Sequence, residues 1–178
     1  MQSRKRLIFL LVVLVAMLVF LTRVMEVGKT GGHSHREQEA AEPVPEEVRE
    51  ELKQQLKLKP LQDVEVVTTS SGLKYQDIKV GTGRRPKPGE TVVVNYIGWK
   101  TNGQAFDTSL IPGRKPHEFR LGKREVVEGW DEGVGTMKVG GKRRLTIPPK
   151  LAYGEMGYPP TIKPNETLIF DVELLEIR

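Results

Sequence analysis

The sequence predicts an α+β domain in which a twisted antiparallel β-sheet half-wraps around one short α-helix. From about residue 62 onward, apolar and polar residues alternate with a period of two, which is typical of strands with one buried face. Within this region, only the segment 126–137 repeats its apolar residues at helical spacing. One amphipathic helix packed on one sheet buries both apolar surfaces, so these two patterns together predict the fold class.

The predicted strands follow one another with short breaks. V-E-V-V-T-T and G-L-K-Y-Q-D-I-K-V come first, and E-T-V-V-V-N-Y-I-G-W-K follows a loop rich in Gly and Pro. Asn102-Gly103 then favours a type I′ hairpin. The last strands are predicted within residues 141–148 and in T-L-I-F-D-V-E-L-L-E-I-R, where Leu168 and Phe170 share one face with the following apolar residues. The basic run 142–144 is interpreted as exposed charge.

The predicted helix carries one of the two tryptophans of the chain. Its apolar stripe is formed by Val126, Trp130, Val134 and Met137. The acidic residues of the segment are expected on the solvated face; they are Glu128, Asp131 and Glu132. Trp130 should therefore lie at an edge of the core, where an indole forms the floor of a pocket or simply fills space.

The N-terminal residues 1–27 are predicted to be a signal anchor or a signal peptide. Three basic residues precede the uncharged apolar run 7–21. No A-x-A cleavage pattern follows, which favours an uncleaved anchor that enters the membrane through residues 7–27 and leaves the domain on the non-cytoplasmic side, in a periplasm or lumen. The alternative is secretion after signal-peptide cleavage.

Two segments separate this N-terminus from the domain, which we place at residues 62–178. Residues 28–45 mix Gly, Pro and charge and predict a flexible linker. Residues 46–61 predict a short amphipathic helix or spacer with Val48 and Leu52 on one stripe. This helix could pack on the domain, pair with a second copy or stiffen the spacer.

Composition excludes several classes of function. The chain has no Cys, so disulfides and thiolate chemistry are excluded. A net charge of +5, spread over the whole chain, does not indicate nucleic-acid binding. No phosphate-binding glycine motif is present, and His117, the only histidine of the domain, has no Ser or acid partner marked by spacing. We expect neither a cofactor nor a metal.

The stretch from about residue 72 to residue 178 resembles the FKBP-type peptidyl-prolyl cis-trans isomerases, the immunophilins that bind tacrolimus and rapamycin. The resemblance rests on V-V-V-N-Y-I-G, F-D-T-S, F-R-L-G-K-R-E-V-V-E-G-W-D-E-G-V, L-A-Y-G-E-M-G-Y-P-P-T-I-K-P-N-E-T and L-I-F-D-V-E-L-L, which follow in family order. The segment S-S-G-L-K-Y-Q-D-I-K-V-G-T-G is similar to membrane-anchored or exported bacterial and organellar members. The resemblance implies an FKBP-like fold.

The same resemblance implies a site built around Trp130, on which the substrate proline ring would rest. The implied catalytic residues are Tyr96, Phe106, Asp107, Trp130, Tyr153 and Phe170. The implied substrate-binding residues are Glu125, Val126, Val127, His117, Tyr158 and Ile162, with Glu125 acting through its carbonyl and Val127 through its N–H. Asp107 could act in catalysis or hold the shape of the pocket.

The implied function is isomerisation of X-Pro bonds during folding of exported proteins, with the proline bound in a dry aromatic pocket and no covalent chemistry. The implied partners are proline-containing polypeptides and macrolides of the tacrolimus and rapamycin type. His117, Tyr158 and Thr161 depart from the family pattern and bear on drug affinity, and Arg114 lies near the place of the arginine that partners the acid. The alternatives are a proline-binding module or chaperone without turnover, and an assembly factor held by the 46–59 helix.

Overall fold

The computed structural model describes residues 50, 53, 54, 56–111 and 113–178. The predicted membrane segment 1–27 and the predicted linker 28–45 lie outside these residues, as does part of the helix predicted over 46–59. All described residues belong to one compact unit. In this part of the chain, no helix is long and apolar enough to cross a membrane.

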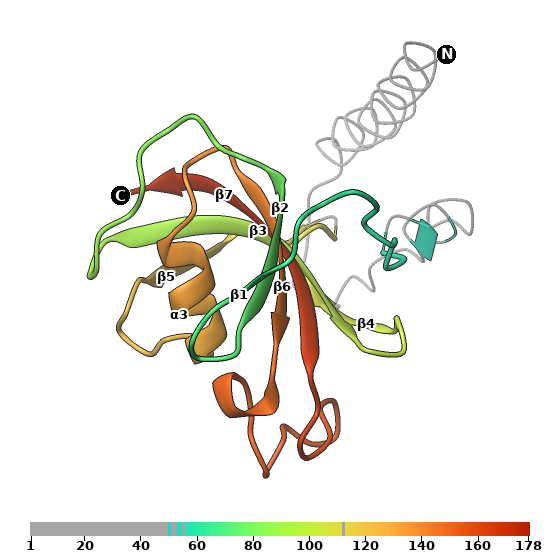
Figure 1. The fold of residues 1–178 in the computed structure, drawn as a ribbon. Coiled ribbons are helices and arrows are strands. Elements are labelled where there is room, and N and C mark those ends of the chain that lie inside the picture. Colours follow the sequence, from blue (N-terminus) through green and yellow to red (C-terminus); the bar gives the residue numbers. More distant parts are fainter. Residues whose placement is uncertain (1–49, 51–52, 55, 112) are drawn as a thin grey trace, which may run out of the picture. The chain divides into compact units, whose positions relative to one another are not determined.

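Seven strands form one antiparallel sheet (Figure 1). They are β1 (Val67–Thr68), β2 (Lys74–Lys79), β3 (Thr91–Lys100), β4 (Ala105–Thr108), β5 (His117–Arg120), β6 (Lys142–Ile147) and β7 (Leu168–Ile177). The order is β1-β2-β6-β7-β3-β4, and β5 also pairs with β3. The long strands β3 and β7 pair along nearly their whole length, from Val92 opposite Ile177 to Lys100 opposite Leu168.

The helix α3 (Glu128–Gly135) lies against one face of this sheet (Figure 1), so the predicted α+β arrangement is confirmed. Trp130 and Val134 are buried on the helix. The regular helix is shorter than the apolar stripe, because Val127 caps it in an extended conformation and Thr136 ends it. The stripe residues outside the helix still reach the core, since Met137 is buried and Val126 packs on the core cluster.

The acidic residues of α3 do more than face solvent. The Asp131 carboxylate accepts hydrogen bonds from the backbone N–H groups of Gly122 (2.8 Å) and Arg124 (3.3 Å). The Glu132 carboxylate accepts one from the Ser71 hydroxyl at 2.7 Å. The helix face that was predicted to be solvated therefore also binds two loops, one that contains Gly122 and Arg124 and one that contains Ser71.

Two glycines allow α3 to approach β6 closely. A Cβ atom on Gly133 would lie 2.5 Å from Cδ2 of Leu145, and one on Gly129 would lie 2.5 Å from Cγ2 of Ile147. Both of these strand residues are fully buried. The helix can approach the sheet this closely because neither glycine carries a Cβ atom.

We expect Gly133→Ala to lower the free energy of unfolding by about 1–3 kcal/mol, because the added methyl overpacks a closed interface. Gly135→Ala is a matched control, since its Cβ would lie 3.6 Å from Leu121, an ordinary van der Waals contact. There the higher helix propensity of alanine should stabilise by up to about 1 kcal/mol. Urea unfolding of both variants checks this, and equal effects at the two positions would contradict it.

The turn between β3 and β4 differs from the predicted type I′ hairpin. That type needs positive φ at both central residues, and of Asn102 and Gly103 only Gly103 has it, at 82°. The Gly103 N–H donates to the Lys100 carbonyl (2.9 Å), and the Asn102 side chain accepts from the Gln104 N–H (3.0 Å). The hydrogen bond to the Asn102 side chain stabilises this turn without the positive φ at Asn102 that the dipeptide pattern predicts.

The basic run 142–144 is not exposed charge as predicted, because Arg143 and Arg144 are 5% and 8% exposed. On the α3 side of the sheet, the Arg143 guanidinium pairs with Asp77 (2.7 Å) and donates to the Gly133 carbonyl (2.8 Å) near the end of the helix. The charge at this position is satisfied by a carboxylate, one helix carbonyl and the Thr136 hydroxyl, which is why it can be buried.

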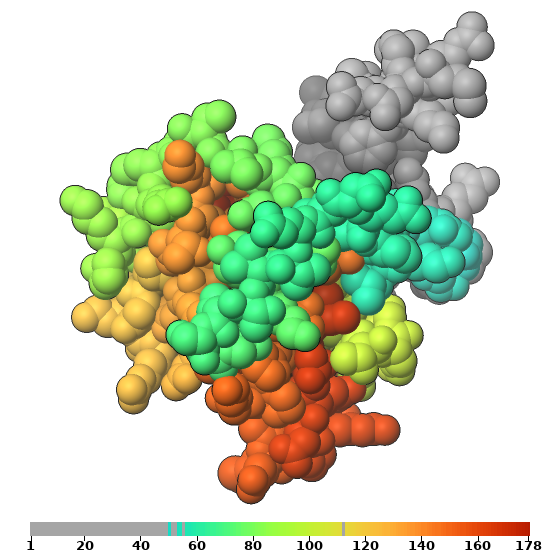
Figure 2. Space-filling model, in the orientation of Figure 1, coloured from blue at the N-terminus to red at the C-terminus, as the bar shows by residue number. Residues whose placement is uncertain are grey.

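On the opposite face of the sheet, Arg144 and Trp99 hold the segment that precedes the domain. Arg144 donates to the carbonyl of Lys59 (2.6 Å), and the Trp99 indole N–H donates to the carbonyl of Leu56. Trp99 is only 2% exposed. In Figure 2 this teal segment lies against the red strand β7. The last residues of the predicted spacer therefore pack on the domain.

Candidate active site

A cluster of aromatic rings surrounds Trp130 at one end of α3. The ring centroids of Tyr96, Phe170, Phe119 and His117 lie 5.1, 5.3, 5.8 and 6.0 Å from that of Trp130. The strands β3, β7 and β5 supply these rings, and the helix supplies the indole in their centre. Most of the pairs are edge-to-face, the geometry that aromatic quadrupoles favour.

The Trp130 indole N–H makes no polar contact within this cluster. Among the described residues, its N–H is the one buried side-chain polar group that lacks a hydrogen-bond partner. The ring is 4% exposed. An aromatic face held in place by packing alone can accept an apolar group without losing hydrogen bonds of its own.

Phe106 on β4 extends the cluster, and Gly98 makes room for it. The Phe106 ring lies 5.6 Å from that of Phe170, edge to face. A Cβ atom on Gly98 would lie 2.7 Å from Phe170 and 2.9 Å from Phe106. Any side chain at this position of β3 would displace one of the two rings. Gly98 is thus a site residue that spacing alone does not reveal.

A cavity of about 400 Å³ adjoins the cluster at Tyr96 and His117. Its other lining residues are Ser109, Arg114, Lys115, Pro116 and Glu118, so one side is aromatic and the other is charged. A second cavity, near Arg143 and Met137, measures about 60 Å³ and is too small for more than a few water molecules. The larger cavity is the candidate site.

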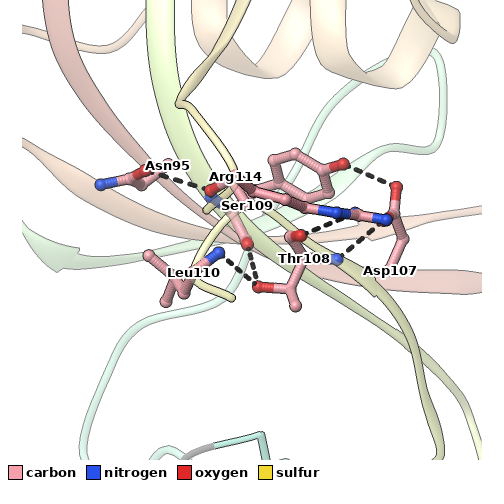
Figure 3. A network of polar contacts seen from close by, with 7 residues as sticks. Asn95, Asp107, Thr108, Ser109, Leu110 and Arg114 are labelled. Carbon is pink, nitrogen blue, oxygen red and sulfur yellow. Dashed lines mark hydrogen bonds and ion pairs between the residues drawn. The ribbon is translucent and has the colours of Figure 1, made fainter. Parts of the chain in front are cut away.

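Asp107 is the centre of a polar network beside the rings (Figure 3). It accepts hydrogen bonds from the Tyr96 hydroxyl (2.6 Å), from the Arg114 guanidinium (2.6 Å) and from the Thr108 N–H (2.9 Å). Arg114 also donates to the Thr108 carbonyl (2.9 Å). The network ties β3, β4 and the following loop together.

The network sets the charge states of its members. Burial alone would raise the pKa of Asp107, but hydrogen bonds from Tyr96 and Arg114 outweigh it and hold the pKa below its ordinary value. Burial, and then the hydrogen bond to Asp107, raises the pKa of Tyr96 far above its ordinary value. The bond to Asp107 raises the pKa of Arg114. At neutral pH the carboxylate is charged and the phenol is neutral.

The loop between β6 and β7, orange in Figures 1 and 2, projects past one end of the sheet. Tyr153 and Tyr158 lie on it with ring centroids 5.6 Å apart, and both are more than one third exposed. Burial, with Tyr158 next, raises the pKa of Tyr153, so its hydroxyl remains a donor at neutral pH. Ile162 is buried, and its N–H and carbonyl bond to Tyr158.

The predicted binding residues that precede α3 lie at the start of the helix. Val126 and Val127 are partly buried against the core cluster. The Val127 carbonyl accepts a hydrogen bond from the backbone N–H of Trp130 at 2.9 Å. The Glu125 side chain points elsewhere, because its carboxylate pairs with Arg120 at 2.6 Å. This leaves only the Glu125 backbone for a role in the site.

The structure brings most of the predicted residues together. Tyr96, Phe106, Trp130, His117 and Phe170 form one cluster, and Asp107 bonds to it through Tyr96. Tyr153 and Tyr158 contact each other on the projecting loop. Arg114, which the resemblance puts near the place of the arginine that partners the acid, does pair with Asp107. An arginine close in sequence to a predicted acid was the available signal.

Comparison with known proteins agrees with this geometry. The family model described as FKBP-type peptidyl-prolyl cis-trans isomerase matches residues 82–175. FK506-binding protein 4 of Dictyostelium discoideum is 63% identical over 110 residues, which cover 62% of this chain and 29% of that protein. The FKBP-type peptidyl-prolyl cis-trans isomerase FkpA of Escherichia coli is 50% identical over 113 residues, which cover 64% of this chain and 40% of FkpA.

The fold is also shared with a solved structure. The crystal structure of FkpA from Escherichia coli superposes with a TM-score of 0.60 at 45% identity and covers 75% of this chain and 58% of that one. The chain thus spans 29% and 40% of the length of the two curated relatives described above. The similarity is to one domain of those longer proteins.

Proposed function

Because the chain belongs to the family of FKBP-type peptidyl-prolyl cis-trans isomerases, we propose that it accelerates cis-trans rotation about X-Pro bonds in polypeptides. The observation that carries the proposal is the cluster of rings around Trp130, with an open cavity on one side and an ionised Asp107 beside it. In this proposal the proline ring is held against the indole.

The chemistry needs no nucleophile. Uncatalysed rotation crosses a barrier of about 18–20 kcal/mol because it breaks the resonance of the amide. The planar amide is dipolar and well hydrated, whereas the twisted amide has a less polarised carbonyl. Removal from water costs an unpaired amide about 2–7 kcal/mol, and a penalty that falls mainly on the planar form lowers the barrier by about tenfold for each 1.4 kcal/mol.

The polar groups would orient the chain on either side of the proline. In this proposal Tyr153 donates its hydroxyl, Val127 donates its backbone N–H to a substrate carbonyl, and Glu125 offers its backbone carbonyl. Tyr158 and Ile162 would form the rim contributed by the projecting loop. The Asp107 network would hold Tyr96 and the loop of Arg114 in place, a positioning role rather than proton transfer.

The setting we propose is the folding of exported proteins, in which proline isomerisation is a slow step. It is supported by the basic residues and the apolar run 7–21 at the N-terminus, which favour a membrane anchor with the domain on the non-cytoplasmic side. The intact mass of the protein recovered from its native membrane tests this. Loss of residues 1–27 would replace the anchor with a cleaved signal peptide.

Macrolides of the tacrolimus and rapamycin type are further proposed ligands of the same pocket. The aromatic cluster supports such binding, and we expect His117 beside Trp130 and the exposed Tyr158 to influence its strength. Competition of the macrolide with a proline peptide measures this affinity directly.

The decisive experiment is exchange spectroscopy of a Leu-Pro peptide with the full-length chain in detergent micelles. We expect faster exchange than with the peptide alone. A chain that binds the peptide without accelerating exchange would instead be a binding module. A pull-down of a membrane complex that is lost on deletion of residues 46–59, while isomerisation survives, would favour the assembly factor.

Asp107→Val should lower kcat/KM by about tenfold or more, because it removes the acceptor for the Tyr96 hydroxyl and for the Arg114 guanidinium, each worth about 1–3 kcal/mol. Asp107→Asn is the matched control: it keeps a side-chain oxygen and should lose less activity. Both are measured in the same exchange assay, with circular dichroism to confirm the fold. Unchanged activity of the valine variant would remove Asp107 from the site.

A further inference from the structure

His117 is the first residue of β5 and forms one wall of the candidate site. It pairs with Val94 of β3. Its ring stacks on Phe119 at 5.9 Å and meets Trp130 and Tyr96 edge to face at 6.0 and 6.2 Å. The imidazole also lines the cavity of about 400 Å³. An exposed imidazole thus stands beside aromatic rings at the edge of the cavity.

Four titratable groups at or near this cavity keep their charge states across the neutral range, namely Asp107, Tyr96, Tyr153 and Arg114. The pKa of Asp107 is lowered, since hydrogen bonds from Tyr96 and Arg114 outweigh its burial. Burial raises the pKa of Tyr96 and of Tyr153, and the bond to Asp107 raises that of Arg114. The carboxylate therefore stays ionised and the phenols stay neutral between pH 5.5 and 8.

Charged groups of both signs line the same cavity as His117. Arg114 and Lys115 line the cavity on the loop before β5, and Glu118 lines it on β5 itself. The Glu118 carboxylate is paired with Arg178 at 2.7 Å. Tyr96 from β3 and Trp130 from α3 present no charge. Arg114 is paired with Asp107 in the same way, so Lys115 is the one charged residue of this lining that forms no ion pair with the described residues.

We propose that His117 is a specificity-determining residue that makes substrate binding in this site depend on pH and on the charge next to the proline. Histidine is the side chain that ordinarily changes charge between pH 5 and 8. A neutral imidazole can be covered by an apolar proline ring, whereas a protonated one loses hydration when it is covered. This inference rests on the proposed isomerase function.

The sign of the effect follows from the charge. Covering by an apolar substrate favours the neutral form, so binding of such a substrate should weaken as the solution is made more acidic. A substrate with a carboxylate beside its proline behaves differently. Its negative charge is attracted to the protonated imidazole, and to Arg114 and Lys115 as well. Acidic conditions should therefore shift preference from apolar to acidic neighbours of proline.

The test compares kcat/KM of the full-length chain for Leu-Pro and Glu-Pro peptides at pH values from 5.5 to 8, with the uncatalysed rate subtracted at each. For Leu-Pro we expect kcat/KM to fall by about threefold to tenfold from pH 8 to pH 5.5. Glutamate is mostly ionised at about pH 5.5, so the ratio of Glu-Pro to Leu-Pro should rise over the same range.

Three variants test whether His117 causes the pH dependence of kcat/KM. His117→Phe keeps an aromatic wall that cannot titrate, and His117→Gln keeps a neutral polar one if the phenylalanine variant folds poorly. In either variant the pH 8 to pH 5.5 ratio of kcat/KM should lie within about twofold of one. The double variant His33→Gln/His35→Gln removes the other two histidines of the chain and should keep the slope of the wild type.

The outcomes separate the two proposals. Wild-type chain that accelerates exchange with a flat pH profile overturns the role of His117 and leaves the isomerase function standing. The same holds if the two His117 variants keep the wild-type slope. Absence of catalysis at every pH overturns the proposed function and, with it, this inference.

Discussion

Trp130→Leu is expected to lower kcat/KM for a Leu-Pro peptide by at least about tenfold in a chain that still folds. Leucine keeps an apolar side chain at the end of α3 but removes the flat face around which Tyr96, Phe119 and Phe170 are arranged. Trp130→Phe retains a ring and removes the unpaired indole N–H. It should therefore keep more activity than the leucine variant.

These two variants distinguish a pocket floor from a residue that only fills space. Both shorten a buried side chain, so both should lower the free energy of unfolding, by up to about 3 kcal/mol. Urea unfolding gives the folded fraction under assay conditions, and kcat/KM is expressed per folded molecule. If activity per folded molecule is the same in both variants and in the wild type, Trp130 serves only the core.

The location of the aromatic cluster was predictable in part, because burial in a sheet follows a local rule. Side chains alternate between the two faces of a strand, so the pattern of β7 predicted that Phe170 faces the core. The pattern of β3 did not single out Tyr96, because this strand is buried on both faces, and only the family resemblance indicated that residue. Both rings lie next to the indole. The helical stripe likewise placed Trp130 in the core.

The buried arginines of β6 were not predictable from the same rule. Their alternation is that of a strand, but a basic run predicts exposure because a lone charge is costly to bury. The partner of Arg143 comes from β2 and that of Arg144 from β7, 66 and 27 residues away in sequence. Likewise, the bond from Arg114 to Asp107 depends on a loop conformation that no local pattern specifies.

Arg144→Met is expected to lower the free energy of unfolding by about 3–5 kcal/mol, because it leaves a buried carboxylate without its partner. Arg144 and Asp171 stand directly opposite each other on β6 and β7 and are joined by two hydrogen bonds of 2.6 and 2.9 Å. Their side chains are only 9% and 11% exposed. Urea unfolding of the variant measures the loss.

The double variant Arg144→Met/Asp171→Leu should recover most of that stability, since a buried ion pair replaced by packed apolar side chains costs little or nothing. Arg178→Met is the matched control. Its pair with Glu118 is about half exposed at both ends, so the change should stay within about 1 kcal/mol. Equal losses for Arg144→Met and Arg178→Met would show that the inner pair is hydrated and contributes no more than a surface pair.

Arg144 also holds the segment that precedes the domain against the sheet, because its third guanidinium nitrogen donates a hydrogen bond to the Lys59 carbonyl. The double variant restores the packing of the sheet but not this bond. Cleavage by trypsin after Lys57 should therefore be faster in Arg144→Met and remain faster in the double variant, while the stability of the domain returns. Cleavage that slows to the wild-type rate in the double variant would show that domain stability alone holds the segment, and that the arginine bond contributes nothing to it.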